Sequence, residues 1–353
     1  MKNLTLLLLV LAFVSCKKDD EVTQYDPTPY TLEYGNFPAP KLPADNPLTV
    51  AGVELGRMLF YEQMLSKDGT QSCATCHKAE DNFNDIRRFS IGVEGGEGRR
   101  NAMSVSNLAW HNTGFFWNGR AATLREQALK PIQDPVEMNE TLVNVKTKLK
   151  SSKLYRDQFT KAFKDPEINS DKVALALEQF MFTMVSHDSK YDKWLKGTAQ
   201  LTDSEERGRV LFFTEKDPFN NIKGAECFHC HNGFDFSNHS ITNNGLDADA
   251  DFKDLGRFEV TKNASDKAKF KTPSLRNIEL TPPYMHDGRF VTLEEVIEHY
   301  NSEIKQSSTL DPLLYTIQAG LELTPQDKAD LIAFLKTLTD QNFTTNPKFQ
   351  TPF

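Results

Sequence analysis

Apolar residues recur along most of the chain at the three- and four-residue spacing of amphipathic helices, and few segments alternate as strands do. The clearest helix begins after Thr324, with Pro325 at its first position. Its apolar positions are Leu331, Phe334, Leu335 and Leu338. Residues 202–205, Thr-Asp-Ser-Glu, form a capping box that opens a second helix, and residues 171–185 should form a third. The pattern therefore predicts a mainly α fold.

The N-terminal segment follows a different pattern. Its apolar run, residues 4–14, is too short to span a membrane and fits the core of a signal peptide. Residues 13–15, Phe-Val-Ser, then lead to Cys16 as in a lipoprotein cleavage box. We expect residues 1–16 to be a lipoprotein signal peptide ending at an acylated Cys16, which would anchor the protein to a membrane; an ordinary secretory signal is the alternative. Residues 17–46 are polar and dotted with proline, which predicts a tether.

Composition narrows the class of protein. The net charge is −8 and no basic stripe stands out, so nucleic acid is not an expected partner. Roughly 300 residues follow the tether, which suits two domains, expected at 47–200 and 201–353. The chain has five cysteines, and all except Cys16 fall in two pairs.

The two cysteine pairs carry the candidate chemistry. Residues 73–77, Cys-Ala-Thr-Cys-His, and residues 227–231, Cys-Phe-His-Cys-His, both have the spacing of a c-type haem attachment site. The thioethers would form at Cys73, Cys76, Cys227 and Cys230, and the proximal iron ligands would be His77 and His231. A zinc site would need four ligands close together, and a redox dithiol does not need the histidines. We therefore expect two covalently bound haem c groups, each inside a cytochrome c-like domain, in a protein located outside the cytoplasm.

The two halves of the chain repeat one pattern. Residues 56–60, Gly-Arg-Met-Leu-Phe, recur as residues 208–212, Gly-Arg-Val-Leu-Phe. After each haem motif, residues 118–120, Asn-Gly-Arg, recur as residues 287–289, Asp-Gly-Arg. Because these landmarks and the haem motifs come in the same order, they indicate two copies of one haem module.

The duplication predicts how the two irons differ. A filled sixth position makes a haem iron an electron relay, whereas an open one makes it a site for chemistry. Tyr300 in the second module corresponds to Pro131 in the first. Tyrosine can ligate iron and proline cannot, so the first haem should be open. The second iron should be ligated by His231 and Tyr300, and two other residues remain as alternatives to the tyrosine: Met285 and His299.

Longer stretches of both modules resemble a known family. Residues 116–121, Phe-Trp-Asn-Gly-Arg-Ala, and residues 134–138, Asp-Pro-Val-Glu-Met, resemble the N-terminal half of the bacterial di-haem cytochrome c peroxidases. Residues 272–277, Thr-Pro-Ser-Leu-Arg-Asn, and residues 281–284, Thr-Pro-Pro-Tyr, resemble their C-terminal half. The related MauG enzymes share this frame. The resemblance covers nearly everything after the tether and implies a peroxidase-type oxidoreductase, in a family whose members are often homodimers.

The resemblance also implies roles for individual residues. Trp117 matches a tryptophan that lies between the two haems on the electron path. Gln127 and Glu137 match the polar pair of the peroxide pocket, in which Glu137 would move a proton during O–O cleavage. An interdomain calcium ion is implied as a further cofactor, with ligands at Asn101, Thr281 and Pro283.

The chain departs from the peroxidase pattern at two places. Many members carry a loop histidine that blocks the first haem until the second is reduced, and Val93 stands at that position here. His111 lies nearby in the sequence but matches no ligand of the family, so a surface or core histidine is expected. At Tyr300 typical peroxidases have methionine, whereas MauG has tyrosine.

The sequence leaves three functions open. The leading hypothesis is a di-haem peroxidase of the cell envelope, as a periplasmic or outer-membrane lipoprotein. It would reduce hydrogen peroxide to water with electrons from a small cytochrome c or a copper protein of the cupredoxin class. The first alternative is a MauG-like oxidase that acts on a protein partner, and Tyr300 favours it. The second is a non-catalytic electron-transfer protein with two closed haems.

Overall fold

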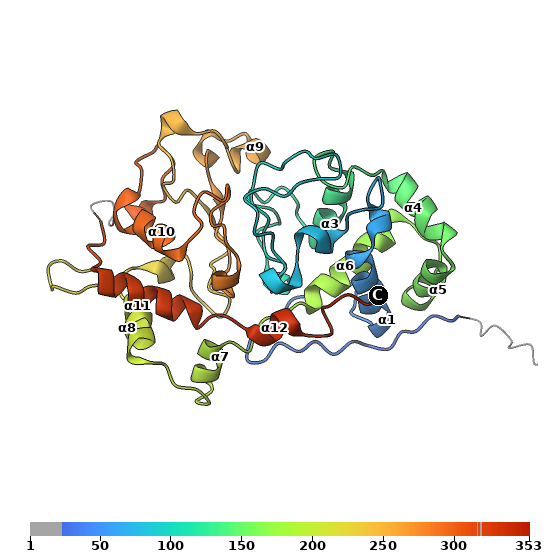
Figure 1. Cartoon of the computed structure of the whole chain (residues 1–353), viewed down its shortest axis with the longest axis horizontal. Helices are drawn as coiled ribbons and strands as arrows, with labels where there is room; N and C mark the ends of the chain where they lie inside the picture. The colour runs from blue at the N-terminus through green and yellow to red at the C-terminus, as the bar shows by residue number, and fades with distance from the viewer. Residues whose placement is uncertain (1–22, 316, 318–319) are drawn as a thin grey trace, which may run out of the picture.

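The computed structural model describes residues 23–315, 317 and 320–353, so Cys16 and the predicted signal peptide lie outside the described residues. Figure 1 shows two helical lobes side by side. The helices of the first lobe are α1 (Val50–Tyr61), α2 (Cys73–Cys76), α3 (Leu124–Gln133), α4 (Leu142–Ser151), α5 (Lys153–Ala162) and α6 (Ser170–Thr183). Those of the second are α7 (Lys190–Leu195), α8 (Asp203–Phe212), α9 (Phe258–Thr261), α10 (Leu293–Glu298) and α11 (Pro325–Lys336), and α12 (Gln341–Thr345) lies between the lobes.

Sheet structure is almost absent from the described chain. Its one sheet pairs β1 (Ile241–Thr242) antiparallel with β2 (Phe270–Lys271). The helices expected from the capping signals are present: Thr202 caps α8 and Thr324 caps α11, each through its side-chain oxygen. The prediction of a mainly α fold is therefore confirmed.

One helix pair in each lobe touches through a glycine. In the first lobe α1 crosses α6 at Gly56, where an added Cβ would lie 1.9 Å from the carbonyl oxygen of Ala176. In the second lobe α8 crosses α11 at Gly208, where an added Cβ would lie 1.9 Å from the carbonyl oxygen of Asp330. No side chain fits between the two backbones at either crossing, which explains why both copies of the repeat have a glycine at this position.

Each lobe is built around three buried phenylalanines at corresponding positions of the repeat. They are Phe60, Phe83 and Phe180 in the first lobe and Phe212, Phe236 and Phe334 in the second. The ring of Phe60 lies 6.3 and 5.5 Å, centroid to centroid, from the other two rings of its set. The corresponding distances from Phe212 are 5.9 and 5.2 Å. The duplication seen in the sequence is thus also a duplication of the hydrophobic core.

The two lobes contact each other reciprocally. The side-chain nitrogen of Asn107 in the first lobe donates to Oδ1 of Asp235 in the second, at 3.1 Å. The side-chain nitrogen of Asn277 in the second lobe donates to Oδ1 of Asn82 in the first, at 2.9 Å. Because Asn107 corresponds to Asn277 and Asn82 to Asp235 in the repeat, the lobes are related by an approximate two-fold axis.

Both ends of the described chain cross from one lobe to the other. Phe343, in α12, lies 5.4 Å from Phe83 and so packs into the core of the first lobe. Phe37, in the segment predicted as a tether, is buried, with its ring 4.8 Å from that of Phe234 in the second lobe. Residues 23–46 contain no helix, and in Figure 1 this N-terminal segment runs below the first lobe as far as the junction of the two lobes. Within the described residues, no helix is both long and apolar enough to cross a bilayer.

Candidate active site

Each haem attachment motif fixes its histidine through a backbone carbonyl. In the first motif, Nδ1 of His77 lies 2.8 Å from the carbonyl oxygen of Phe83. In the second motif, Nδ1 of His231 lies 3.0 Å from the carbonyl oxygen of Phe236. A histidine bonded in this way through Nδ1 presents Nε2 as its free ligand atom, which is the usual arrangement around a bound metal. The residues of both motifs therefore fit covalently bound haem c.

A cavity adjoins the second motif and extends to residues of the first lobe. Part of its lining consists of Cys227, Cys230 and His231. Apolar side chains form much of the rest, including Phe212, Leu275, Ile278, Leu293, Leu331 and Leu335. An apolar lining with a few placed polar groups is what a large, flat and mostly hydrocarbon cofactor requires.

Asn244 brings the candidate distal ligands of the second haem together. Its side-chain nitrogen donates to the Tyr300 hydroxyl at 3.1 Å and lies 3.4 Å from the sulfur of Met285. Both residues line the same cavity as His231. Nε2 of His299 instead contacts the backbone carbonyl of Asn244 at 3.0 Å, so this ring nitrogen is engaged. The geometry thus places Tyr300 and Met285 side by side and gives His299 a structural contact.

The local backbone explains how Tyr300 reaches the cavity. It lies in a π-helical turn, His299–Glu303, that follows α10. Such turns insert one extra residue and are frequent at functional sites. Burial raises the pKa of Tyr300 to about 12, so the hydroxyl keeps its proton unless a metal ion displaces it. The corresponding place in the first lobe is Pro131, inside α3.

The residues expected on the distal side of the first haem lie in α3 and in the turn that follows it. Gln127 and Pro131 are four residues apart in α3 and so share one helix face. Glu137 is half-buried in the following turn, where its backbone nitrogen donates to the carbonyl of Asp134 at 3.0 Å. Burial, together with the Asp134 carboxylate, raises the pKa of Glu137 to about 7, and Arg120 opposes the shift. Glu137 can therefore both hold and release a proton near neutral pH.

The loop at Val93 packs against the turn that carries Glu137. The backbone nitrogen of Val93 donates to the carbonyl oxygen of Glu137 at 2.9 Å. Gly92 lies so close to the turn that an added Cβ would stand 2.3 Å from the carbonyl oxygen of Val136. The loop is therefore held against the turn that carries Glu137, and the side chain of Val93 offers iron no ligand atom.

Trp117 lies where the two lobes meet. Its indole nitrogen donates to the carbonyl oxygen of Asn101 at 2.8 Å, and its own carbonyl accepts from the backbone nitrogen of Lys271 in the second lobe at 2.7 Å. Trp117 also lines the cavity next to the second haem motif. The indole is consequently fixed at the boundary between the first module and the second haem site.

Three oxygen atoms converge beside Asn101. Its side-chain nitrogen faces the carbonyls of Arg87 and Arg88, at 3.3 and 3.4 Å. In this orientation the side-chain oxygen faces two more carbonyl oxygens, 2.8 Å away in Ala102 and 3.3 Å away in Pro283. Two arrangements relieve this crowding: the amide turns over and donates, or a cation binds among the oxygens. Thr281 lines the cavity nearby, with its hydroxyl on the carbonyl of Ile278.

Comparison with known proteins decides the family. Residues 50–200 match the model of a family described as di-haem cytochrome c peroxidase. The chain is 36% identical to the methylamine utilization protein MauG of Methylophilus methylotrophus, over 84% of each chain. It is 35% identical to the cytochrome c551 peroxidase of Nitrosomonas europaea, over 90% of this chain and 87% of that one. The chain belongs to the di-haem cytochrome c peroxidase family.

A solved structure of this family has the same fold. The crystal structure of a MauG-like protein associated with microbial copper homeostasis superimposes with a TM-score of 0.83 at 36% identity. The match covers 92% of this chain and 99% of that one. The predictions of a di-haem peroxidase-type oxidoreductase, of two haem c cofactors and of cytochrome c-like domains are therefore confirmed.

Two features of this family member were missed by reasoning from the sequence. Asn244, which contacts both Tyr300 and Met285, gave no signal beyond lying in a loop rich in glycine and asparagine. His111, expected to be an ordinary core or surface histidine, is buried but lies beside Asp235 and His239 from the other lobe. Nothing in the sequence links His111 to Asp235 or His239, which lie more than a hundred positions later, so only the fold reveals this cluster.

Proposed function

We propose that this di-haem peroxidase reduces hydrogen peroxide to water with electrons from a small cytochrome c or a cupredoxin. Bound haem supplies the iron that takes peroxide when its sixth position is open. The observation that carries the proposal is the Glu137 carboxyl group, which has a pKa of about 7 and lies in the turn directly after α3. At the position that corresponds to Tyr300, α3 has Pro131, which cannot ligate iron. A distal site with a proton carrier and no protein ligand suits cleavage of an O–O bond.

The residues around the first haem would divide the work. Glu137 would accept a proton from one oxygen of hydrogen peroxide and return it to the other, which would leave as water. Two electrons from the donor protein and two protons from solvent would convert the remaining oxygen to a second water molecule. Gln127, on the same face of α3 as Pro131, orients peroxide by hydrogen bonding. Trp117 provides an aromatic ring between the second haem site and the first module, on the path by which electrons would arrive.

Replacing Glu137 by glutamine tests this proposal directly. Glutamine keeps the size and hydrogen bonding of the side chain but carries no exchangeable acid proton. Because general acid–base assistance is typically worth about 10²–10⁴-fold, the second-order rate constant for peroxide should fall by that order. Stopped-flow mixing of the purified protein with peroxide measures it, while the haem spectrum checks that both groups are retained. A loss smaller than about threefold would show that Glu137 is structural.

A MauG-like oxidase acting on a protein partner is the second candidate. The observation that favours it is the position of the Tyr300 hydroxyl, 3.1 Å from the side-chain nitrogen of Asn244 and in the cavity of the second haem. A tyrosinate ligand stabilises ferric and higher oxidation states, which an oxidase needs in order to withdraw electrons from a protein. Turnover of peroxide with a reduced cytochrome c supports the peroxidase; no turnover, with a long-lived oxidised state, supports the oxidase.

The convergence of oxygens at Asn101 supports a calcium ion held by Asn101, Thr281 and Pro283. Calcium takes several oxygen ligands, including backbone carbonyls, and an ion here would join the two modules beside Trp117. Chelation followed by Ca²⁺ titration should lower and then restore peroxide activity. Failure of both changes would remove calcium from the proposal and leave the turned-over amide as the explanation.

The cell-envelope location rests on the haem motifs and on the N-terminal segment. Covalent haem c and an acylated Cys16 would both place the protein outside the cytoplasm, on a periplasmic or outer-membrane surface. The domain limits 47–200 and 201–353, the anchor at Cys16 and a homodimer remain proposals. Mass spectrometry of the membrane fraction tests the anchor, and light scattering of the delipidated protein tests the dimer.

A further inference from the structure

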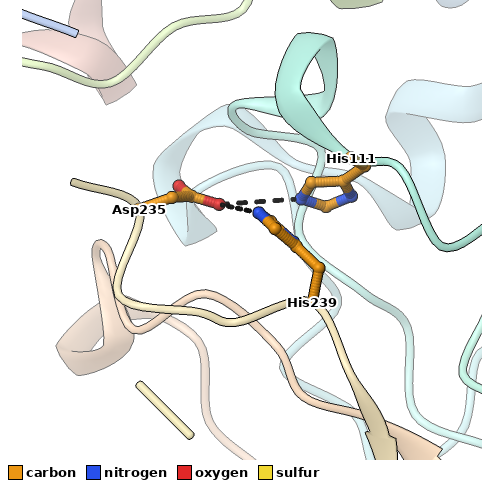
Figure 2. Close-up of side chains that lie close together, drawn as sticks. All are labelled: His111, Asp235 and His239. Atoms are coloured by element: carbon orange, nitrogen blue, oxygen red, sulfur yellow. Dashed lines mark ion pairs between the residues drawn. The ribbon is translucent and has the colours of Figure 1, made fainter. Parts of the chain in front are cut away.

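A cluster of polar side chains lies at the lobe interface, and one of them, His111, also lines the cavity next to the second haem motif. His111 comes from the first lobe, and Asp235 and His239 come from the second (Figure 2). Nε2 of each imidazole lies 3.8 Å from Oδ2 of Asp235. One ligand atom from each side chain lies within 4.8 Å of the others. The three side chains therefore surround one shared point.

Two of the atoms that face this point are buried and unpaired. The side chains of His111 and Asp235 are 8% and 1% exposed. Among the described residues, Nε2 of His111 and Oδ2 of Asp235, which face this point, find no hydrogen-bond partner. The unpaired atom of His239 is its other ring nitrogen, Nδ1, while its Nε2 faces Asp235. Buried polar atoms almost always have a partner, because leaving them without one is costly. Unpaired buried atoms from two side chains, with a ring nitrogen of a third directed at the same point, indicate that a ligand belongs there.

The first module serves as an internal comparison. Asn82 occupies the place of Asp235, and both atoms of its side-chain amide are hydrogen-bonded to neighbouring side chains. Ile86 occupies the place of His239, 153 positions earlier. The fold of the two loops is repeated, but the positions of Asp235 and His239 hold an amide and an aliphatic side chain in the first loop. The cluster is therefore not a requirement of the haem module itself.

We propose that His111, Asp235 and His239 bind one divalent transition-metal ion, Zn²⁺ or Cu²⁺. Imidazole and carboxylate are ligands that these ions accept together. With bonds of ~2.0–2.1 Å, two ligand atoms on a tetrahedral ion stand roughly 3.3 Å apart, so each 3.8 Å separation needs to shorten by about half an ångström. Burial lowers the pKa of both histidines, to about 4 for His239, which keeps the rings neutral as metal ligands must be.

A neighbouring lysine opposes the ion. Nζ of Lys271 lies 2.8 Å from Nδ1 of His111 and 3.1 Å from the carbonyl oxygen of Gly114. Without metal, the lysine donates to Nδ1, and the proton of the ring is on Nε2, which faces Asp235. A metal at Nε2 displaces one proton from this pair to solvent, after which Nδ1–H donates to the lysine amine. Removing Lys271 should therefore strengthen metal binding.

The site would brace the second haem. Asp235 directly precedes Phe236, whose carbonyl oxygen holds Nδ1 of His231 at 3.0 Å. A metal bound to Asp235 and His239 would fix this loop, and its bond to His111 would tie the loop to the first lobe. The ion would then hold the orientation of the iron ligand without touching the iron.

Metal uptake by the purified di-haem protein tests the proposal. The protein is treated with chelator, returned to excess Ca²⁺ and titrated with Zn²⁺ or Cu²⁺ in separate experiments, and bound metal is counted after gel filtration. We expect about one ion per chain in the wild type and less than about one tenth of that in His239→Ala and Asp235→Asn. Asparagine keeps Oδ1 as the acceptor for Asn107 and Ser274, so Asp235→Asn should fold. The matched control is His187→Gln, outside the cluster, which should keep the ion.

A further variant protects the test against misfolding. Lys271→Met should bind the ion at least about tenfold more tightly than the wild type, because the opposing cation is gone. The haem spectrum of every variant confirms that the haem groups are retained. Two results would overturn the proposal and leave a water molecule at this point. One is metal uptake by His239→Ala equal to that of the wild type. The other is no uptake by either the wild type or Lys271→Met.

Discussion

Glu137 should give this peroxidase a pH dependence whose position follows from the surroundings of the carboxyl group. Burial, aided by Asp134, raises its pKa to about 7. If the ionised form accepts the peroxide proton, the active fraction is about 9% at pH 6 and about 91% at pH 8. The value of kcat/KM for peroxide should therefore rise about tenfold between these pH values, because it reports the free enzyme. If the glutamate had an unperturbed pKa, kcat/KM would change by only a few per cent, roughly, over the same interval.

The assay is stopped-flow reduction of peroxide across this pH interval, with Asp134→Asn as the matched variant. Asparagine keeps the acceptor that binds the backbone nitrogen of Val136 at 3.1 Å but removes the negative charge. Asp134 raises the pKa of Glu137, so its neutralisation should move the inflection to lower pH. Glu137→Gln should abolish the inflection. A flat profile in the wild type, or an inflection that persists unchanged in Glu137→Gln, would refute the assignment of the titrating group.

Three further outcomes are expected. Val93 offers iron no ligand, so the fully ferric protein should react with peroxide as isolated; activity that appears only after half-reduction would contradict this. Tyr300→Phe should convert the second haem to high spin or force a replacement ligand, as followed by electron paramagnetic resonance, whereas a change only in Met285→Leu would reassign the ligand. Gly208→Ala should destabilise the protein by about 1–3 kcal/mol, because its methyl group meets the backbone of α11. Val210→Ala, exposed on the same helix, should stay within about 0.5 kcal/mol, and equal thermal shifts in the two variants would contradict the contact.

Sequence reasoning succeeded where the signal was local or repeated. The two haem motifs are complete within five residues, and their histidines are oriented by the same carbonyl contact in both lobes. The offset between the repeats paired Tyr300 with Pro131. In the structure Tyr300 lies in the π-helical turn that follows α10, and Pro131 lies at the corresponding position of α3. Repetition provides this information because two copies of one fold constrain each other's alignment.

The features that escaped prediction depend on long-range packing. Phe37 lies in a segment whose composition indicates only a tether, yet it stacks under the guanidinium group of Arg276, 4.4 Å from its ring centroid. Phe343 packs into the core of the lobe that begins almost three hundred residues earlier. Neither contact follows from periodicity, because hydrophobic spacing indicates which residues are buried and not which neighbour buries them.

The crossed hydrogen bonds of Asn107 and Asn277 give the lobe interface two equivalent contacts within one chain. An exchange in which each copy gives the other the same contact is the geometry of an isologous dimer. In a true dimer of identical chains, any substitution changes both contacts together. Because the two halves here belong to one chain, a residue can differ on one side alone. Asn82 and Asp235 are such a pair, since the same repeated position is an amide in one lobe and a carboxylate in the other.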